Sequence, residues 1–179
     1  MTVVHTIYSP IDGSVVAERA LADDAHVENV LHRASSAQRV WRSTPLDERI
    51  AMCERMVRWL EDNVADIAHE ITVQMGRPIR YTPNEILRGA QERARHMMSF
   101  AGENLGDIAV PQVDGFTKFI RREPIGTVLI VAPWNYPYLT AINSLVPALL
   151  AGNTVIMKHA SQTLLCAERF SQACEAAGF

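Results

Sequence analysis

Residues Ile125 to Met157 read IGTVLIVAPWNYPYLTAINSLVPALLAGNTVIM and carry the clearest fold signal in the sequence. The run IGTVLIV is continuously apolar and rich in β-branched residues, which is typical of a strand buried on both faces of a parallel sheet. A helix follows from about Tyr138 to Leu150, and NTVIM forms a second buried strand. Thr163 to Ala177 then predicts a second helix, closed by Gly178. Strand, helix, strand, helix in this order predicts an α/β fold with two parallel strands.

Two strands alone would leave most edges of the sheet unpaired and most of its apolar faces uncovered. We therefore interpret residues 125–179 as the start of a larger parallel sheet. On the same ground, the chain is expected to be the front part of a larger protein.

The region before this sheet predicts a hairpin and four helices. Residues 2 to 20 form two short strands joined at Asp12-Gly13, a strong turn signal. Apolar residues then recur at spacings of three and four in four stretches. The capping signals that open these stretches are Asp23 or Asp24, Thr44-Pro45, Asn63 and Thr82-Pro83-Asn84-Glu85. The buried stripe predicted for the first helix comprises Val27, Val30, Leu31, Ala34, Ala37 and Trp41. The stripe predicted for the second helix comprises Leu46, Ile50, Cys53, Met56, Val57 and Leu60, and that of the fourth comprises Leu87, Ala90, Ala94, Met97 and Ala101.

The chain becomes extended from Asp107 onward, and Phe116 to Arg122 alternates imperfectly between apolar and basic residues. This pattern predicts a half-exposed strand. The free edge of such a strand could pair with another subunit or could simply be protected by its charges, and the pattern leaves both readings open.

Composition and charge exclude several classes of function. Of 179 residues, 48% are hydrophobic and 21% charged, and the formal charge is -3. These values are ordinary for a globular protein and give no electrostatic reason to expect a nucleic acid or a membrane as partner. No apolar run is long enough for a bilayer span and the start lacks a secretory pattern, so we expect a cytoplasmic location. The three cysteines lack CxxC spacing, which indicates buried helix positions rather than disulfides or a metal site.

Ligands of open parallel sheets gather at the carboxyl ends of the strands. The first segment there is Ala132-Pro133-Trp134-Asn135-Tyr136-Pro137. Its two prolines stiffen the turn, and the amide of Asn135 is a fixed donor of the kind that stabilises charge on a carbonyl oxygen. An asparagine that only satisfies backbone groups in a proline-rich turn would give the same pattern.

The second segment, Lys158-His159-Ala160-Ser161-Gln162-Thr163, follows the second strand. Lys158 can contact a ribose or phosphate, and Ser161 lies where a helix start presents amide groups to anions. A surface lysine before an ordinary cap is the alternative. His159 has no nucleophile or carboxylate partner in the pattern, which disfavours a catalytic histidine. Since GxGxxG, GxxxxGK[ST] and GxSxG are all missing, the sites that those motifs form are not expected.

The two segments together resemble the aldehyde dehydrogenase superfamily. VAPWNYP at Val131 to Pro137 and PALLAGNTVIMKHASQT at Pro147 to Thr163 match its paired motifs in order and separation. The amino-terminal hairpin, MGRPI at Met75 to Ile79, the extended pair around Asp107 to Glu123 and REPIGTV look similar as well. The likeness covers essentially the whole chain, but only the amino-terminal part of such an enzyme.

The resemblance implies an amino-terminal helical segment leading into an incomplete Rossmann-like parallel sheet, with an extended oligomerisation hairpin. Residues 1–106 would form the hairpin and the helical part of the cofactor-binding domain. Residues 107–124 would be the oligomerisation segment, and residues 125–179 the start of the NAD(P)-binding sheet. The complete protein would be a homodimer or homotetramer acting on a small-molecule aldehyde.

The resemblance also implies roles for single residues. Asn135 matches the catalytic asparagine whose amide holds an oxyanion, and Lys158 matches a lysine that contacts the adenosine ribose. The implied cofactor-binding residues are Ala132, Pro133, Trp134, Asn135, Lys158, His159, Ala160 and Ser161. The implied reaction is attack of a cysteine thiolate on the aldehyde, hydride transfer to NAD or NADP, and thioester hydrolysis assisted by a glutamate.

Several positions depart from the family pattern. Ser161 stands where NAD-preferring members often carry a glutamate, which opens the choice to NADP. His159 and Leu164 replace frequent prolines, and Asn143 with Ser144 weakens a preference for acidic semialdehydes. The nucleophilic cysteine, the glutamate and the glycine-rich turn are expected beyond Phe179, so residues 1–179 alone should be inactive. A non-catalytic cofactor-binding or assembly module and an acylating or semialdehyde-reducing relative are the alternatives.

Overall fold

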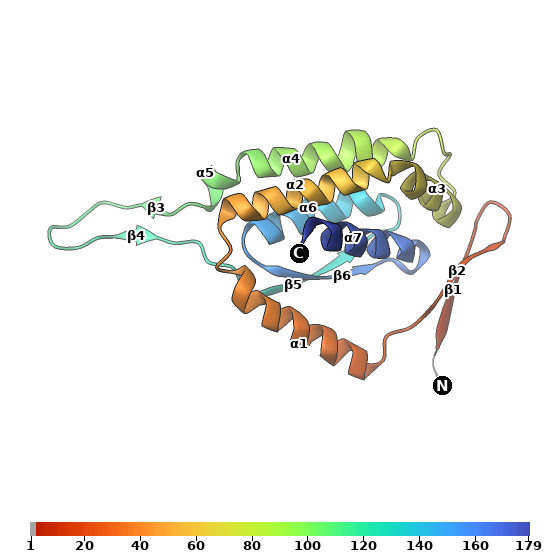
Figure 1. Ribbon diagram of the computed structural model, residues 1–179, viewed down its shortest axis with the longest axis horizontal. Helices are drawn as coiled ribbons and strands as arrows, with labels where there is room; N and C mark the ends of the chain where they lie inside the picture. Colours follow the sequence, from red (N-terminus) through yellow and green to blue (C-terminus); the bar gives the residue numbers. More distant parts are fainter. Residues whose placement is uncertain (1–2) are drawn as a thin grey trace.

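The computed structural model describes residues 3–179 and contains three small two-stranded sheets among helices (Figure 1). In chain order the elements are β1 (Val4–Tyr8), β2 (Val15–Ala20), α1 (Asp24–Trp41), α2 (Leu46–Asp62), α3 (Val64–Met75), the π-helical segment η1 (Glu85–Ala90), α4 (Gln91–Ser99), α5 (Ala101–Leu105), β3 (Ile108–Ala109), β4 (Phe119–Ile120), β5 (Thr127–Ala132), α6 (Pro137–Leu150), β6 (Thr154–His159), the 3-10 turn η2 (Ser161–Thr163) and α7 (Leu164–Ala177).

The predicted strand, helix, strand, helix order of the carboxyl-terminal part is confirmed. β5 and β6 pair in parallel, from Thr127 opposite Thr154 to Ala132 opposite His159. α6 connects the two strands, and α7 ends at Gly178, whose φ of 90° is the left-handed conformation that glycine adopts most easily. The α/β fold class and the parallel sheet therefore agree with the sequence.

The β5–β6 sheet is buried on one face. Ile130 and Ala132 lie in the core, and α6 and α7 pack over that face (Figure 1). On the other face Leu129 is 64% exposed and Val131 66% exposed. Nothing within residues 3–179 covers these two side chains, which agrees with the expectation that two strands alone leave apolar faces of the sheet uncovered.

The main core lies between that sheet face and the helices α2, α3, α4, α6 and α7. The predicted stripe of α2 is confirmed by Cys53, Met56, Val57 and Leu60, all of which are buried. In the fourth predicted helix Ala90, Ala94 and Ala101 are buried as expected. Leu87 is exposed there, and its neighbour Ile86 takes the buried position within the π-helical segment η1.

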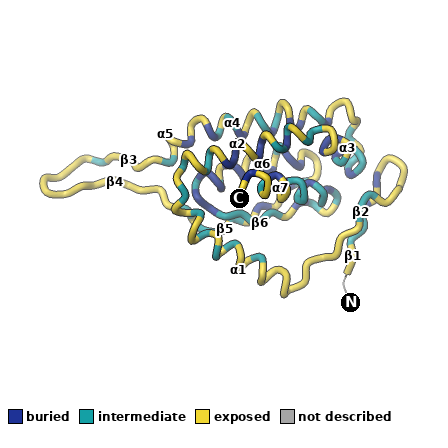
Figure 2. Tube along the Cα trace, in the orientation of Figure 1, coloured by how far each residue is buried: buried dark blue, intermediate teal, exposed yellow. Residues whose placement is uncertain are grey.

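The stripe predicted for the first helix is wrong, because no residue of α1 is buried and both Val27 and Leu31 are largely exposed (Figure 2). α1 lies along β6 and is held there by polar contacts. A cavity of about 720 Å³ separates parts of α1 from α7 and β6. The apolar stripe therefore faces this cavity and solvent instead of close-packed neighbours.

The helix caps agree only in part with the sequence signals. Asp23 caps α1 as predicted, since its Oδ1 accepts a hydrogen bond from the His26 amide at 2.8 Å. Thr44 makes no cap, because α2 begins after Pro45 without a side-chain cap bond. Asn63 donates instead to the Trp59 carbonyl oxygen at the end of α2. Local cap signals therefore located the helix starts better than they identified the capping groups.

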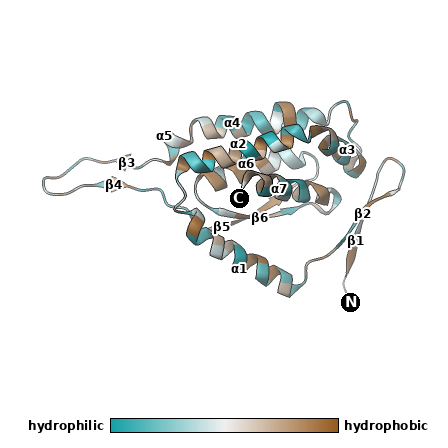
Figure 3. Cartoon of the chain, in the orientation of Figure 1, coloured by the Kyte–Doolittle hydropathy of each residue, from teal (hydrophilic) through white to brown (hydrophobic). Residues whose placement is uncertain are grey.

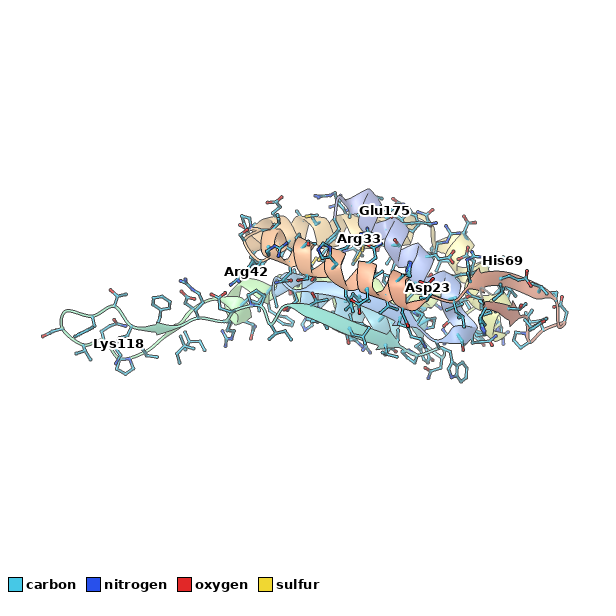
Figure 4. The ribbon with its side chains drawn as sticks, turned by 90° about the horizontal axis from the view of Figure 1, so that it is seen from below. Asp23, Arg33, Arg42, His69, Lys118 and Glu175 are labelled. Atoms are coloured by element: carbon cyan, nitrogen blue, oxygen red, sulfur yellow. The ribbon has the colours of Figure 1, made fainter. Side chains whose placement is uncertain are left out.

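The amino-terminal hairpin is confirmed, with β1 and β2 antiparallel and Gly13 left-handed at φ 76°. The strand predicted for Phe116 to Arg122 is much shorter, since β4 contains only Phe119 and Ile120, paired with Ile108 and Ala109 of β3. A two-stranded hairpin is only marginally stable without a third strand, and the pairing of this one stays short. This segment projects from the helical body, with Lys118 far from it (Figures 1 and 4).

Across residues 3–179, none of the helices combines the length and apolar character that crossing a bilayer requires. Figure 3 shows hydrophobic and hydrophilic residues alternating along the helices rather than forming one apolar segment.

Candidate functional site

The two segments singled out in the sequence lie side by side at the carboxyl end of the β5–β6 sheet. The last residues of the strands, Ala132 and His159, are partners in the ladder, and the Ala160 amide donates to the Ala132 carbonyl oxygen at 3.0 Å. Lys158 and His159 belong to β6 itself, so the strand runs two residues further than predicted. Both segments therefore leave the sheet at one edge.

The side chains at this edge differ in exposure. Trp134 is 54% exposed, Asn135, Lys158 and Ser161 are also exposed, and Ala132 is buried. Pro133 and Ala160 are half-buried. The side-chain amide of Asn135 makes no hydrogen bond to any residue of the described chain, 3–179. This carboxamide is therefore available to a ligand.

Lys158 lies opposite Val131 in the parallel ladder, so both side chains leave the same face of the sheet. That is the face on which Leu129 and Val131 are uncovered. An ammonium group at the rim of an apolar surface can contact the sugar or phosphate of a ligand whose ring lies on the apolar part.

His159 is placed differently from its neighbours. It is 1% exposed, and its ring stacks on Phe170 with centroids 5.8 Å apart and an interplanar angle of 20°. Neither ring nitrogen has a hydrogen-bond partner among the described residues. Burial lowers the pKa of His159 to about 4. The His159 ring is therefore a neutral group of the core, and only the backbone of His159 lies at the carboxyl end of β6.

The start of α7 is partly satisfied from within the chain. The Leu165 amide donates to Gln74 Oε1 at 3.1 Å, and the Thr163 amide donates to the Ala160 carbonyl oxygen. His5 of the amino-terminal hairpin lies 3.2 Å from the Ser161 carbonyl oxygen. The start of α7 therefore has fewer free amide groups for an anion than an ordinary helix start would have. The side chain of Ser161 is exposed.

The turn after β5 is held by two charged residues that the sequence did not connect with it. Arg77 donates from Nη2 to the Asn135 carbonyl oxygen and from Nη1 to Glu85. Glu85 Oε1 accepts hydrogen bonds from the amides of Tyr138 at 2.8 Å and Leu139 at 3.2 Å. Burial raises the pKa of Glu85, although the two amides and the Arg77 guanidinium oppose this shift.

No pattern in the sequence predicts that Arg77 and Glu85 contact the turn after β5. Arg77 lies within MGRPI and Glu85 follows Thr82-Pro83-Asn84, a stretch that reads as an ordinary helix start. Their partners lie more than fifty residues further along the chain. An acidic residue in a first helical turn normally complements its own helix, whereas Glu85 serves the first turn of α6.

The cysteines do not supply a nucleophile. Burial raises the pKa of Cys53 to about 12 and that of Cys174 to about 12, and it raises the pKa of Cys166 further still. Their thiols are protonated at neutral pH, and nucleophilic attack requires the thiolate. Their interpretation as buried helix residues is confirmed for Cys53 and Cys166, while Cys174 is partly buried.

Comparison with known proteins gives a consistent result. The profile described as "Aldehyde dehydrogenase family" matches residues 3–179. An aldehyde dehydrogenase of Paenarthrobacter nicotinovorans is 35% identical over 151 residues, which are 80% of this chain and 33% of that protein. The chain therefore spans about a third of the length of that relative.

Solved structures agree with the sequence comparison. An NAD-dependent benzaldehyde dehydrogenase from Corynebacterium glutamicum superposes with a TM-score of 0.89 at 30% identity, over 98% of this chain and 38% of its own. An NADP-dependent glyceraldehyde-3-phosphate dehydrogenase from Bacillus halodurans, complexed with NADP, gives a TM-score of 0.88 at 27% identity, again over 98% and 38%.

Proposed function

The chain belongs to the aldehyde dehydrogenase family, and from this premise we propose that it holds an aldehyde carbonyl and part of a nicotinamide cofactor in an NAD(P)-dependent oxidoreductase. The observation that carries the proposal is the exposed carboxamide of Asn135. It projects from a turn whose backbone is hydrogen-bonded before and after Asn135, at the carbonyl oxygens of Ala132 and Tyr136. The carboxamide itself makes no hydrogen bond to residues 3–179.

Asn135 is proposed to donate its side-chain amide to the carbonyl oxygen of the substrate. A donor that is already oriented stabilises the negative charge that develops on that oxygen without reorganising during the reaction. The two prolines of the turn and the ladder contact at Ala132 limit how far the backbone can move.

The cofactor is proposed to lie across the carboxyl ends of β5 and β6. Lys158 and Ser161 would contact its sugar and phosphate part, and Pro133 and Trp134 would line the nicotinamide side. Ala132 beside them, His159 and Ala160 would contribute backbone contacts only. NAD(P), when bound, supplies the acceptor for a hydride. The exposure of Lys158, Ser161 and Trp134 at one edge fits this arrangement, and the small Ser161 hydroxyl leaves room for NADP.

The thiol nucleophile and the base are proposed to come from a part of the enzyme outside residues 1–179. The raised pKa values of the three cysteines support this assignment, as does the share of relatives that the chain spans. Residues 1–179 alone are accordingly expected to be inactive. The cytoplasmic location and the division at residues 106 and 124 remain predictions from sequence.

Substitution of Asn135 by alanine tests the proposal. In the full-length protein expressed from its natural gene, Asn135→Ala should lower kcat by about 100- to 1000-fold, as for removal of one oxyanion donor. Nicotinamide absorbance in the presence of an aldehyde is the readout. Asn29→Ala, at an exposed asparagine of α1, is the matched control. An unchanged kcat for Asn135→Ala would contradict the role, and product formation that depends on coenzyme A would favour the acylating alternative.

A further inference from the structure

The first turn of α6 is capped by a residue from another part of the chain. Its N-cap residue, Tyr136, makes no side-chain cap bond, and Pro137 has no amide hydrogen. The next two amides, those of Tyr138 and Leu139, both donate to Glu85 Oε1. A carboxylate at this position satisfies amides that the helix leaves free and complements its dipole. Glu85 thus fixes where α6 begins.

Arg77 links this cap to the turn that carries Asn135. One side of its guanidinium holds the second carboxylate oxygen of Glu85, and the other donates to the Asn135 carbonyl oxygen. The guanidinium also lies 4.2 Å from the ring centroid of Tyr136. A planar group with several donors can span two acceptors in this way. The backbone is therefore held at Asn135 and again just after Pro137.

The Arg77–Glu85 pair is shielded from water. The Glu85 side chain is 0% exposed and that of Arg77 is 15% exposed. Hydrogen bonds in such surroundings are stronger and more directional than at a surface. Gly76, left-handed at φ 79°, ends α3 directly before Arg77. Glu85 opens the π-helical segment η1, a type of distortion that is frequent at functional sites.

The position of the Asn135 carboxamide depends on its backbone, since the side chain makes no hydrogen bond to residues 3–179. We propose that Arg77 and Glu85 are positioning residues that hold the turn so that the Asn135 amide meets the carbonyl oxygen of the substrate. This inference rests on the proposed function. Neither residue contacts the substrate, and both act through the turn.

Two conservative substitutions test Arg77 and Glu85 one at a time. Arg77→Lys keeps a positive charge beside Glu85 but replaces the planar fork by a single ammonium, so the contacts to Asn135 and Tyr136 weaken. Glu85→Gln keeps an oxygen for the Tyr138 and Leu139 amides but removes the charge that holds Arg77. In the full-length protein each variant should lower kcat by about 10- to 100-fold, with KM changed less than about threefold.

A double-mutant cycle tests whether Arg77 acts through Asn135. Arg77→Lys is measured in the natural background and in the Asn135→Ala background. If the inference holds, Arg77→Lys lowers kcat further by less than about twofold once Asn135 is already alanine, because the group that it positions is gone. Equal losses in both backgrounds, or no loss in the natural one, would overturn the inference. If Asn135→Ala itself leaves kcat unchanged, the proposed function fails first and the inference falls with it.

Amide hydrogen exchange of the free protein gives a readout independent of activity. Arg77→Lys should speed exchange in the peptide that spans residues 134 to 140 by about tenfold or more, since this segment loses its anchor. Arg95→Lys is the matched control, because Arg95 of α4 pairs with Glu54 and Glu61 of α2 and none of its hydrogen bonds reaches residues 134 to 140. Unchanged exchange at residues 134 to 140 in Arg77→Lys, or equal acceleration in both variants, would contradict the inference.

Discussion

His159 shows how a single residue at a binding edge can serve the core instead. It ends β6 beside Lys158, yet the pleat directs the two side chains to opposite faces of the sheet. Lys158 reaches solvent, whereas the His159 ring is enclosed against Phe170 without a hydrogen-bond partner within residues 3–179. Alternation along one strand thus separates a candidate ligand contact from a structural residue.

The buried ring makes stability depend on pH. Because burial lowers the pKa of His159 to about 4, the unfolded chain binds an extra proton between about pH 6.5 and pH 4. The free energy of unfolding should therefore fall by about 3 kcal/mol as the pH is lowered through that window. His159→Leu should remove this loss, as measured by denaturant unfolding at pH 7 and pH 4.

His69 lies on the surface (Figure 4), and His69→Leu controls for the loss of a histidine as such. An acid dependence of His159→Leu as steep as that of the natural protein would show that other groups are responsible.

At the scale of elements, α1 is attached mainly by hydrogen bonds. Gln38 donates to the Gly152 carbonyl oxygen at 2.9 Å and accepts from the Thr154 amide at 2.7 Å. Trp41 Nε1 donates to the Leu149 carbonyl oxygen, and Thr154 Oγ1 donates to that of Ala34. No side chain of α1 is buried. The helix therefore depends on a few polar contacts with the turn before β6.

Gln38→Ala should loosen α1 selectively. Removing both bonds leaves the Thr154 amide and the Gly152 carbonyl without partners, at a cost of about 1–3 kcal/mol for each unsatisfied group that stays buried. Hydrogen exchange should accelerate in residues 24–41 while residues 46–62 of α2 stay protected. Gln172→Ala, on α7, is the control. Equal protection of residues 24–41 in Gln38→Ala and the natural protein would contradict this view of α1.

At the scale of the whole molecule, the uncovered apolar residues include those on the outer face of β5 and those on the projecting segment 107–124. Phe116, Phe119 and Ile120 are exposed on that segment, and its strands pair over only two residues. Exposed apolar side chains next to unpaired strand edges favour association with another chain. Pairing of subunits through this segment remains our prediction.

Ile120→Lys tests the pairing. A charge on the exposed hairpin should lower the mass measured by light scattering to that of a smaller assembly. Ile11→Lys, at a similarly exposed isoleucine in the turn of the other hairpin, should leave the mass unchanged. A natural protein that is already monomeric, or equal masses for all three proteins, would contradict the prediction.

The sequence by itself determined the order of strands and helices, the Asp12-Gly13 turn and the position of the Asn135 turn, because each depends on residues close together in the chain. The buried stripe of α2 was readable for the same reason, through its period. Tertiary structure alone decided that α1 stays exposed, that His159 turns inward and that Arg77 and Glu85 hold the Asn135 turn. Those outcomes depend on which segments meet in the folded chain: the His159 ring stacks on Phe170 of α7, and Arg77 and Glu85 bond to partners more than fifty positions away. Spacing along the chain does not encode the free energy of such tertiary contacts.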